Sequence, residues 1–160
     1  ERELATAWGE MAQRLDADGR RAAVAGFLVQ ETARGGVEVL VGVTRDPDFG
    51  LVLAFGAGGV LVETLRDVAL RTLPLREGDA ADMIAETRVA ALLAGVRGRP
   101  PADVAALART LEAIADLAWA ERESIDEIDV NPIVVRPSGQ GCVVVDALIV
   151  PRRHHSGAQP

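Results

Sequence analysis

The sequence contains no lysine, no tyrosine and a single cysteine among its 160 residues. All 17 basic side chains are arginines, so any phosphate clamp that depends on a lysine must come from outside this chain. The one thiol, Cys142, lies in an apolar run and has no cysteine to pair with, which favours a buried, inert thiol in a reducing compartment. We therefore expect a cytoplasmic protein whose core is built from aliphatic residues, because aromatic residues make up only 3% of the chain.

Long apolar runs and an excess of positive charge are also missing. No apolar stretch approaches the roughly 20 residues of a membrane helix, and the charged start of the sequence lacks the order of a signal peptide. The net charge of −7 disfavours nucleic acids and anionic membranes as partners. It does not exclude ATP, because Mg²⁺ can carry the charge of the phosphates.

The hydrophobic pattern predicts one α+β domain. Hydrophobic residues make up 49% of the chain, which disfavours disorder. Spacing of apolar residues predicts helices over 3–17, 79–94 and from Pro101 to about 120, and strands over 23–32, 37–46, 51–55, 68–75, 125–137 and 142–150. Glycine- and aspartate-rich turns separate the strands, which favours an antiparallel sheet with helices on one side. A polar, frayed tail is expected over 151–160.

The last two predicted strands carry the clearest chemical pattern. Glu127, Asp129 and Asn131 alternate along one strand, so their side chains share a face. If the loop of this hairpin spans residues 137–140, Asn131 lies directly opposite Asp146, and Asp129 lies on the diagonal. Oxygen-bearing side chains that converge in this way suit Mg²⁺, which takes one or two carboxylates and fills its shell with waters and phosphates.

The alternative interpretation of this hairpin is an ordinary solvent-exposed face. Acidic residues are common on such faces, and the Asn131-Pro132 pair is typical of a strand end. Like charges that face one another across strands cost stability, which favours a cation between them.

Three other segments have side chains or backbone suited to a nucleotide. The segment VQETARGGVE offers Gln30 and Glu38 near a glycine turn, and its alternative is a hairpin with polar ends. The FGAGG loop at 55–59 offers exposed backbone to a phosphate but lacks the lysine and hydroxyl of a P-loop. Arginines are the remaining candidates for neutralising phosphate, or are solvated surface residues: Arg45, Arg66 and Arg71. His154 and His155 are neighbours whose side chains point apart, so we expect no shared metal there.

The order of these motifs resembles one known family. VQET-x-x-GGVE, VGVTRDPDFG, FGAGG-x-x-VE, RTLPL, EIDVNP and VVDA follow one another as in the ATP-grasp domain of ADP-forming (NDP-forming) acyl-CoA synthetases. Acetate–CoA ligases and the synthetase-like parts of some protein acetyltransferases belong to this family, and the succinyl-CoA synthetase β chain is a more distant relative. The resemblance runs from about Gly26 to Ile149.

The resemblance implies roles for particular residues. Asn131 and Asp146 correspond to Mg²⁺ ligands, with Asp129 as a third candidate where many ATP-grasp enzymes use Glu. Gln30 corresponds to the residue beside the adenine, and Glu38 to the residue that holds the ribose. The backbone contributors implied by the family are Ala33 near the adenine and Gly56, Gly58 and Gly59 on the phosphate side. No catalytic side chain is implied in this chain.

The implied reaction joins a carboxylate to CoA with conversion of ATP to ADP and phosphate, through a phosphohistidine on another domain. The resemblance assigns residues 1–20 to the tail of a missing first ATP-grasp subdomain, and 21–150 to the second subdomain. It implies CoA-binding and phosphohistidine-bearing domains as partners, and an isolated chain without synthetase activity. Two alternatives stay open: a non-catalytic nucleotide-sensing or scaffold module, as in a protein acetyltransferase, and another carboxylate ligase on the same fold.

Overall fold

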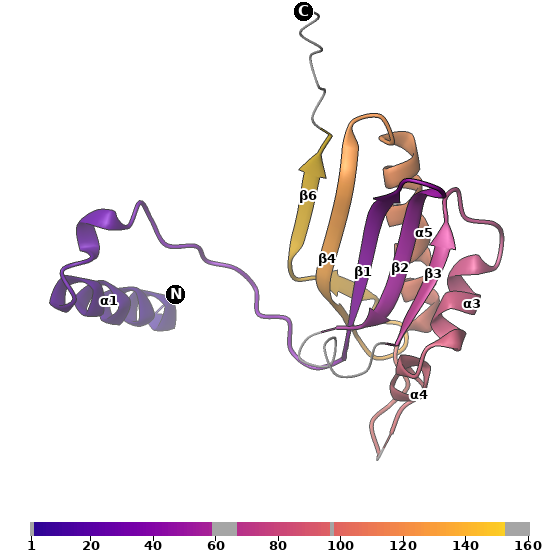
Figure 1. The fold of residues 1–160 in the computed structure, drawn as a ribbon. Helices are drawn as coiled ribbons and strands as arrows, with labels where there is room; N and C mark the ends of the chain where they lie inside the picture. Colours follow the sequence, from indigo (N-terminus) through magenta and orange to yellow (C-terminus); the bar gives the residue numbers. More distant parts are fainter. Residues whose placement is uncertain (1, 59–66, 97, 153–160) are drawn as a thin grey trace, which may run out of the picture. The chain divides into compact units, whose positions relative to one another are not determined.

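The computed structural model describes residues 2–58, 67–96 and 98–152 (Figure 1). The chain divides into two compact units, residues 1–32 and 33–160. The predicted division at residue 20, which assigns the first helix to another subdomain, stays a prediction. No helix in the described ranges combines the length and apolar character needed to cross a bilayer.

The first unit consists of helix α1 (Arg2–Ala17), the short 3-10 helix η1 (Arg21–Ala23) and an extended segment. The amphipathic helix expected from Leu4, Trp8 and Met11 is confirmed, but no residue of α1 is buried. Trp8 packs edge-on against Phe27, with ring centroids 4.4 Å apart.

The strand predicted over 23–32 is wrong, because this segment pairs with none of the described strands. An extended run becomes a strand only when a neighbour accepts its backbone hydrogen bonds.

The second unit is built on a six-stranded antiparallel sheet with strand order β3-β2-β1-β4-β5, in which β6 also pairs with β4. The strands are β1 (Val37–Asp46), β2 (Gly50–Ala57), β3 (Val68–Thr72), β4 (Ile125–Val135), β5 (Cys142–Val144) and β6 (Ala147–Pro151). The first strand of this unit thus lies in the middle of the sheet, beside a strand that follows it by about 80 residues. This arrangement confirms the predicted α+β class with an antiparallel sheet.

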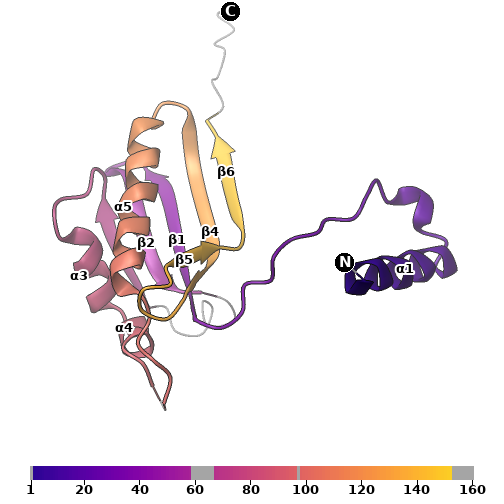
Figure 2. The same cartoon turned by 180° about the vertical axis from the view of Figure 1, so that it is seen from behind.

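Within the described part of the second unit, the helices cover one face of this sheet. Figure 2 shows α3 (Asp79–Glu86) and α5 (Val104–Ala120) in front of the strands, with the short α4 (Val89–Leu93) at one end. The core lies between these layers and is aliphatic apart from Phe55, as the composition predicts. Its largest fully buried side chains are Phe55, Leu53, Met83, Leu93, Leu107, Leu111 and Ile133. No helix of the described residues 67–96 and 98–152 lies on the opposite face (Figure 1).

The helix predicted over 79–94 is two helices separated at Thr87. This residue is buried, leaves the helical region with φ −92° and ψ 153°, and donates its hydroxyl to Ile84 O at 2.9 Å. The local hydrogen bond competes with helix continuation, which is a property of threonine. The last predicted helix begins at Val104, not at Pro101, because the Asp103 side chain caps it by accepting from Ala106 N at 3.0 Å.

The strand predicted over 142–150 is interrupted at residues 145–146, which separate β5 from β6. The folded part also extends into the predicted tail. Pro151 ends β6, and Arg152 N donates to Ser124 O at 2.7 Å. The rest of that tail, including His154 and His155, lies outside the described residues.

Candidate functional site

The face of the sheet opposite α3 and α5 carries an ordered row of residues across five strands. Leu70 of β3 pairs with Ala54 of β2, which pairs with Gly42 of β1. Gly42 pairs in turn with Asp129 of β4, and Asp129 with Leu148 of β6. Directly paired residues point to the same side of an antiparallel sheet, so this row forms a low floor with an aspartate beside it.

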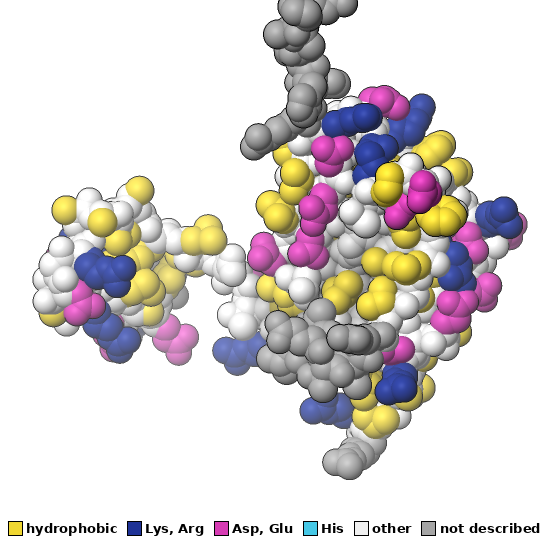
Figure 3. All heavy atoms as spheres, viewed as in Figure 1, with side chains coloured by type: hydrophobic (Ala, Val, Ile, Leu, Met, Phe, Trp, Pro, Cys, Tyr) yellow, Lys and Arg dark blue, Asp and Glu magenta, His cyan; other side chains and the backbone are white. Residues whose placement is uncertain are grey.

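The floor is low because small residues occupy its centre. A Cβ at Gly42 would meet nothing closer than Ile128 O at 3.8 Å, so the open space above the sheet begins at the backbone. Leu70 and Leu148 border the floor and are 57% and 58% exposed. Figure 3 shows this face, with acidic side chains gathered on the β4 and β6 side and hydrophobic ones toward β2 and β3. An apolar strip beside a row of carboxylates suits a ligand with a flat apolar part and an anionic part carried by a cation.

The hairpin register counted from the sequence is confirmed. Arg136 N donates to Gly141 O at 3.0 Å, and the same register continues along β5 and β6. Asn131 N donates to Asp146 O at 3.2 Å, so these two residues lie opposite one another. Asp129 lies two residues before Asn131 on the same strand, which puts it on the diagonal from Asp146.

The donor set of this patch is two carboxylates and one amide. Asp129 and Asp146 are exposed, and Asn131 is half-buried. One oxygen of Asp146 accepts from Ala147 N at 2.9 Å, which orients the carboxylate. In the described ranges, no three His, Cys, Asp or Glu side chains converge as metal ligands. Such a set does not form a cage of protein ligands, but it fits Mg²⁺, which keeps several waters and substrate phosphates in its shell.

Glu38 lies on the same face at one end of β1, where it pairs with Val134. Its carbonyl accepts from Gly58 N at 3.1 Å, which fixes the start of the glycine-rich segment. A cavity of about 600 Å³ lies at this end of the sheet, lined in part by Glu38, Gly58 and Arg99. This volume lies in the range of small-molecule pockets. Arg99 was missed because the sequence presents it only as part of a proline-rich loop.

Packing explains two of the three glycines assigned to the phosphate side. Gly56 lies inside β2, where a Cβ would stand 2.8 Å from Asp67 O. Gly58 leaves no room either, because a Cβ would stand 2.7 Å from the backbone carbon of Val39. Both glycines thus let two backbone segments approach closely, and their contact with phosphate stays a prediction. Gly59 lies outside the described residues.

The predicted adenine-side residues fall on either side of the unit boundary. Gln30 is exposed and belongs to the first unit, whereas Ala33 is half-buried and begins the second. Neither lies in a strand. The structure therefore places four of the predicted residues on one sheet face: Glu38, Asp129, Asn131 and Asp146. Gln30 belongs to the other unit.

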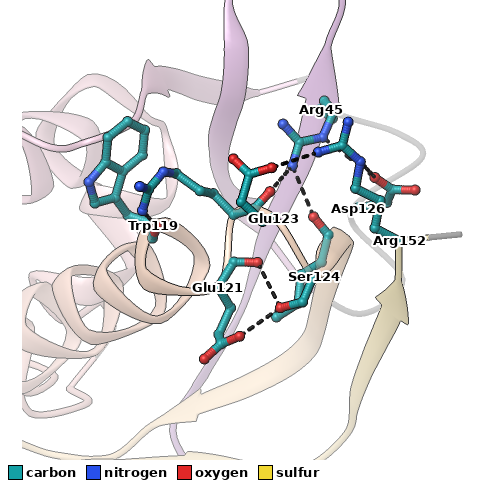
Figure 4. Close-up of polar contacts among 9 residues, drawn as sticks. Arg45, Trp119, Glu121, Glu123, Ser124, Asp126 and Arg152 are labelled. Carbon is teal, nitrogen blue, oxygen red and sulfur yellow. Dashed lines mark hydrogen bonds and ion pairs between the residues drawn. The ribbon is translucent and has the colours of Figure 1, made fainter. Parts of the chain in front are cut away.

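The candidate phosphate arginines are held by other groups in the described structure. Arg45 Nη2 donates to Ile125 O at 3.1 Å and to Arg122 O, and its Nε forms a longer ion pair with Asp126 Oδ1 at 3.5 Å (Figure 4). Arg152 joins the same cluster through Glu123 at 3.3 Å. These contacts connect β1, β4 and the ends of α5 and β6. Arg45 therefore has a structural role at this end of the sheet, where it joins β1 to the start of β4.

Arg71 of β3 is likewise engaged. It forms two hydrogen bonds with Glu86, one of them 3.2 Å long, and lies 3.5 Å from Asp79 Oδ1. The hydrogen bond to Glu86 raises the pKa of Arg71, and the same bond lowers the pKa of Glu86. Arg71 therefore connects β3 to α3, and Arg66 lies outside the described residues.

Comparison with known proteins identifies the family. A family model described as an ATP-grasp domain matches residues 1–150. The chain belongs to this ATP-grasp domain family. The ATP-grasp chain is 40% identical over 148 residues to acetate–CoA ligase [ADP-forming] II subunit beta of Pyrococcus furiosus, covering 92% of this chain and 63% of that relative.

Solved structures agree with this assignment. The ATP-grasp chain matches the dinucleotide forming acetyl-coenzyme A synthetase 1 of Ca. Korarchaeum cryptofilum in complex with coenzyme A, Ca-AMPCP and HgCl⁺ with a TM-score of 0.78 and 41% identity, over 94% of this chain and 65% of that one. A complex of the same synthetase with coenzyme A and Mg-AMPPCP matches with a TM-score of 0.70 and 44% identity, over 75% and 55% of the two chains. The chain thus spans less than two thirds of the length of these relatives.

Proposed function

We propose that this chain is the magnesium- and nucleotide-binding part of an ADP-forming acyl-CoA synthetase, a ligase that forms acyl-CoA from a carboxylate, CoA and ATP. The observation that carries the proposal is the sheet face on which Asp129, Asn131 and Asp146 lie beside a floor of small residues. The relatives support the reaction class, because they are named as ADP-forming acetate–CoA ligases. One related structure contains Mg-AMPPCP together with coenzyme A.

Asn131 and Asp146 hold the magnesium ion in this proposal, and Asp129 is the third ligand. A bound Mg²⁺ neutralises the nucleotide phosphates and holds them for phosphoryl transfer. Asp146 keeps its orientation through the hydrogen bond from Ala147 N, and Asn131 adds an oxygen donor without adding charge. A bound cation matters for neutralising the phosphates, because the chain has no lysine and its Arg45 and Arg71 are engaged elsewhere.

The floor between Leu70 and Asp129 receives the rest of the nucleotide. Glu38, at the end of β1, accepts hydrogen bonds from the ribose hydroxyls in this proposal. The remaining nucleotide contacts that we propose are the Gln30 side chain and Ala33 backbone near the adenine, and the backbone of Gly56, Gly58 and Gly59 near the phosphates. Apolar side chains beside the small floor exclude water from one side of the base.

The groups that react with the acyl substrate are proposed to lie on partner domains. We assign no catalytic side chain to this chain, and we expect CoA-binding and phosphohistidine-bearing domains, fused or separate, with a first ATP-grasp subdomain. Two relatives support this expectation of partner domains. One is a β subunit, and one structure has a phosphohistidine segment pointing towards its nucleotide binding site. A cytoplasmic location is part of the same proposal.

The test compares two isosteric changes on the same strand pair in the full-length protein. Asp146→Asn removes the charge of a proposed ligand and keeps the acceptor for Ala147 N, whereas Glu127→Gln removes a charge from the same sheet face outside the proposed ligand set. We expect Asp146→Asn to abolish Mg-dependent nucleotide binding in calorimetry and acyl-CoA formation, and Glu127→Gln to change both less than about threefold. Equal losses in the two variants, or full activity of Asp146→Asn, would refute the assignment. Nucleotide binding without acyl-CoA formation in the wild type would favour a sensor module.

A further inference from the structure

The β5 strand carries little information about its own register. Its sequence continues as three consecutive valines, Val143 to Val145, directly before Asp146. A slip of one residue that brings Val143 to the place of Cys142 exchanges valine for valine at the other two positions of β5, so side-chain packing penalises it little. The same slip would move Asp146 to the opposite face of the sheet from Asn131, because side chains alternate along a strand.

The ladder is also interrupted where the proposed ligands lie. β5 ends at Val144 and β6 begins at Ala147, so Asp146 lies in the gap between two short strands. The backbone contacts in this gap are Asn131 N to Asp146 O at 3.2 Å and Val145 N to Pro132 O at 3.0 Å. The β4–β6 pairs hold the chain after this gap, whereas β5, on the other side of it, has only three pairs with β4. A contact at the far end of β5 therefore adds to the control of its register.

Asp103 makes such a contact at the closed end of the hairpin. Its Oδ2 accepts from Gly141 N at 3.0 Å, while its Oδ1 accepts from Ala106 N at 3.0 Å. Gly141 is also the residue whose carbonyl accepts from Arg136 N, the first pair of the hairpin ladder. One carboxylate therefore caps α5 and holds the residue from which the register of β5 is counted.

The backbone around Asp103 strengthens this connection. Asp103 N donates to Arg136 O at 2.8 Å, and Ser138 N donates to Pro101 O at 2.9 Å, so the segment before α5 runs beside the hairpin turn. Figure 2 shows this end of α5 next to the loop between β4 and β5. The hydrogen bonds from Gly141 and Ala106 lower the pKa of Asp103, which keeps it an acceptor throughout the neutral range.

We infer that Asp103 is a positioning residue that fixes the register of the β4–β5 hairpin and thereby keeps Asp146 opposite Asn131 for metal binding. The effect of Asp103 on metal binding rests on the proposed function. Its effect on the strand register rests on the backbone contacts alone. Removing a group that is hydrogen-bonded to a metal ligand typically lowers metal affinity by about 10- to 100-fold, and Asp103 acts through the strand instead of touching a ligand, so we expect the lower end of this range.

The test uses Asp103→Ser in the full-length protein. Serine is a good helix N-cap, so α5 keeps its cap, but its single oxygen cannot serve both Ala106 N and Gly141 N. Asp103→Glu keeps two acceptor oxygens on a side chain one methylene longer, and serves as the rescue variant. Asp116→Ser, at an exposed position of the same helix, repeats the chemical change away from the hairpin and is the matched control.

Two measurements distinguish an effect on the strand register from an effect on metal binding. Amide exchange at Gly141 and Arg136, with cross-strand nuclear Overhauser contacts between Asn131 and Asp146, reports the register. Electron paramagnetic resonance with Mn²⁺ and ADP reports the metal site. We expect Asp103→Ser to raise exchange at Gly141 at least tenfold and to weaken Mn²⁺ binding about tenfold, with circular dichroism unchanged. Asp103→Glu should recover part of both effects, because it keeps both acceptor oxygens.

Unchanged exchange and unchanged Mn²⁺ affinity in a folded Asp103→Ser variant would overturn the inference. An equal effect in Asp116→Ser would overturn it as well, because the loss would then reflect helix α5 as a whole. If the wild type does not bind Mn²⁺ with ADP, the proposed function is wrong, and so is the inferred effect of Asp103 on metal binding. The exchange and Overhauser data then still decide whether Asp103 fixes the register.

Discussion

Gly58 provides the sharpest test of how the glycine-rich segment is held. A Cβ at this position would stand 2.7, 2.8 and 2.9 Å from the carbon, oxygen and nitrogen atoms of the Val39 backbone. Val39 lies in β1, which is paired on both sides, so its backbone cannot move without disturbing two ladders. Gly58→Ala must therefore displace the chain after β2 and weaken the 3.1 Å hydrogen bond from Gly58 N to Glu38 O.

The expected cost follows from two contributions. Overpacking against a rigid neighbour costs about 1–3 kcal/mol, and the loss of one backbone hydrogen bond costs about 0.5–1.5 kcal/mol. We expect Gly58→Ala to lower the free energy of unfolding by about 2–4 kcal/mol, measured as a shift of the urea midpoint at constant slope.

Gly42→Ala is the matched control, since a Cβ there meets only ordinary contacts at 3.8 and 4.0 Å. It should change the free energy of unfolding by less than about 0.5 kcal/mol. A Gly58→Ala variant as stable as Gly42→Ala would refute the argument, and would show that the segment after β2 is not held against β1.

Four further outcomes are expected. Gly42→Val should leave the urea midpoint nearly unchanged but weaken nucleotide binding at least tenfold in calorimetry, since its methyl groups fill the floor beside Asp129; unchanged affinity would place the nucleotide elsewhere. Leu107→Ala should cost about 2–5 kcal/mol in urea unfolding because Leu107 is fully buried, against less than about 1 kcal/mol for the 46%-exposed Leu117→Ala, and similar costs would contradict the described core. The folded-state pKa of Asp103 is lowered below its ordinary value of 3.8, so its stabilisation is present above pH 3.8 and lost as the pH falls through the folded-state value; the stability difference between wild type and Asp103→Asn should shrink in that acid range, and a difference that is independent of pH would contradict it. Burial raises the pKa of the Cys142 thiol, so alkylation by iodoacetamide at pH 8 should be slow until the protein unfolds, and alkylation at the rate of an unfolded control would contradict its burial.

The local patterns of the sequence were sufficient for several features. The register of the last hairpin was predictable because side chains alternate with a period of two and the turn residues fix the point from which pairs are counted. The class of the fold followed from apolar spacing and turn chemistry, and was confirmed. The break at Thr87 was not predictable, since it depends on a side-chain hydrogen bond inside a packed core.

Features that depend on strand order were beyond the sequence alone. The floor beside Asp129 exists because β1 lies between β2 and β4, which brings Gly42 next to a residue far along the chain. The contact from Asp103 to Gly141 joins residues 38 positions apart and carries no local signal. The prediction of a strand over 23–32 was wrong for the same reason. Its pattern is apolar, but its pairing depends on a neighbour that the local sequence does not specify.

The central place of β1 in the sheet also has a consequence for synthesis on the ribosome. β1, β2 and β3 can form a meander as they emerge, but the edge of β1 that later pairs with β4 stays open until Val135 has been made. At ordinary elongation rates of roughly 5–20 residues per second, this apolar edge waits several seconds for its partner. An open, aliphatic strand edge is a site for pairing with other chains. We therefore expect the nascent sheet to be most open to such pairing in the interval between the synthesis of β3 and that of β4, before its ligand-binding face exists.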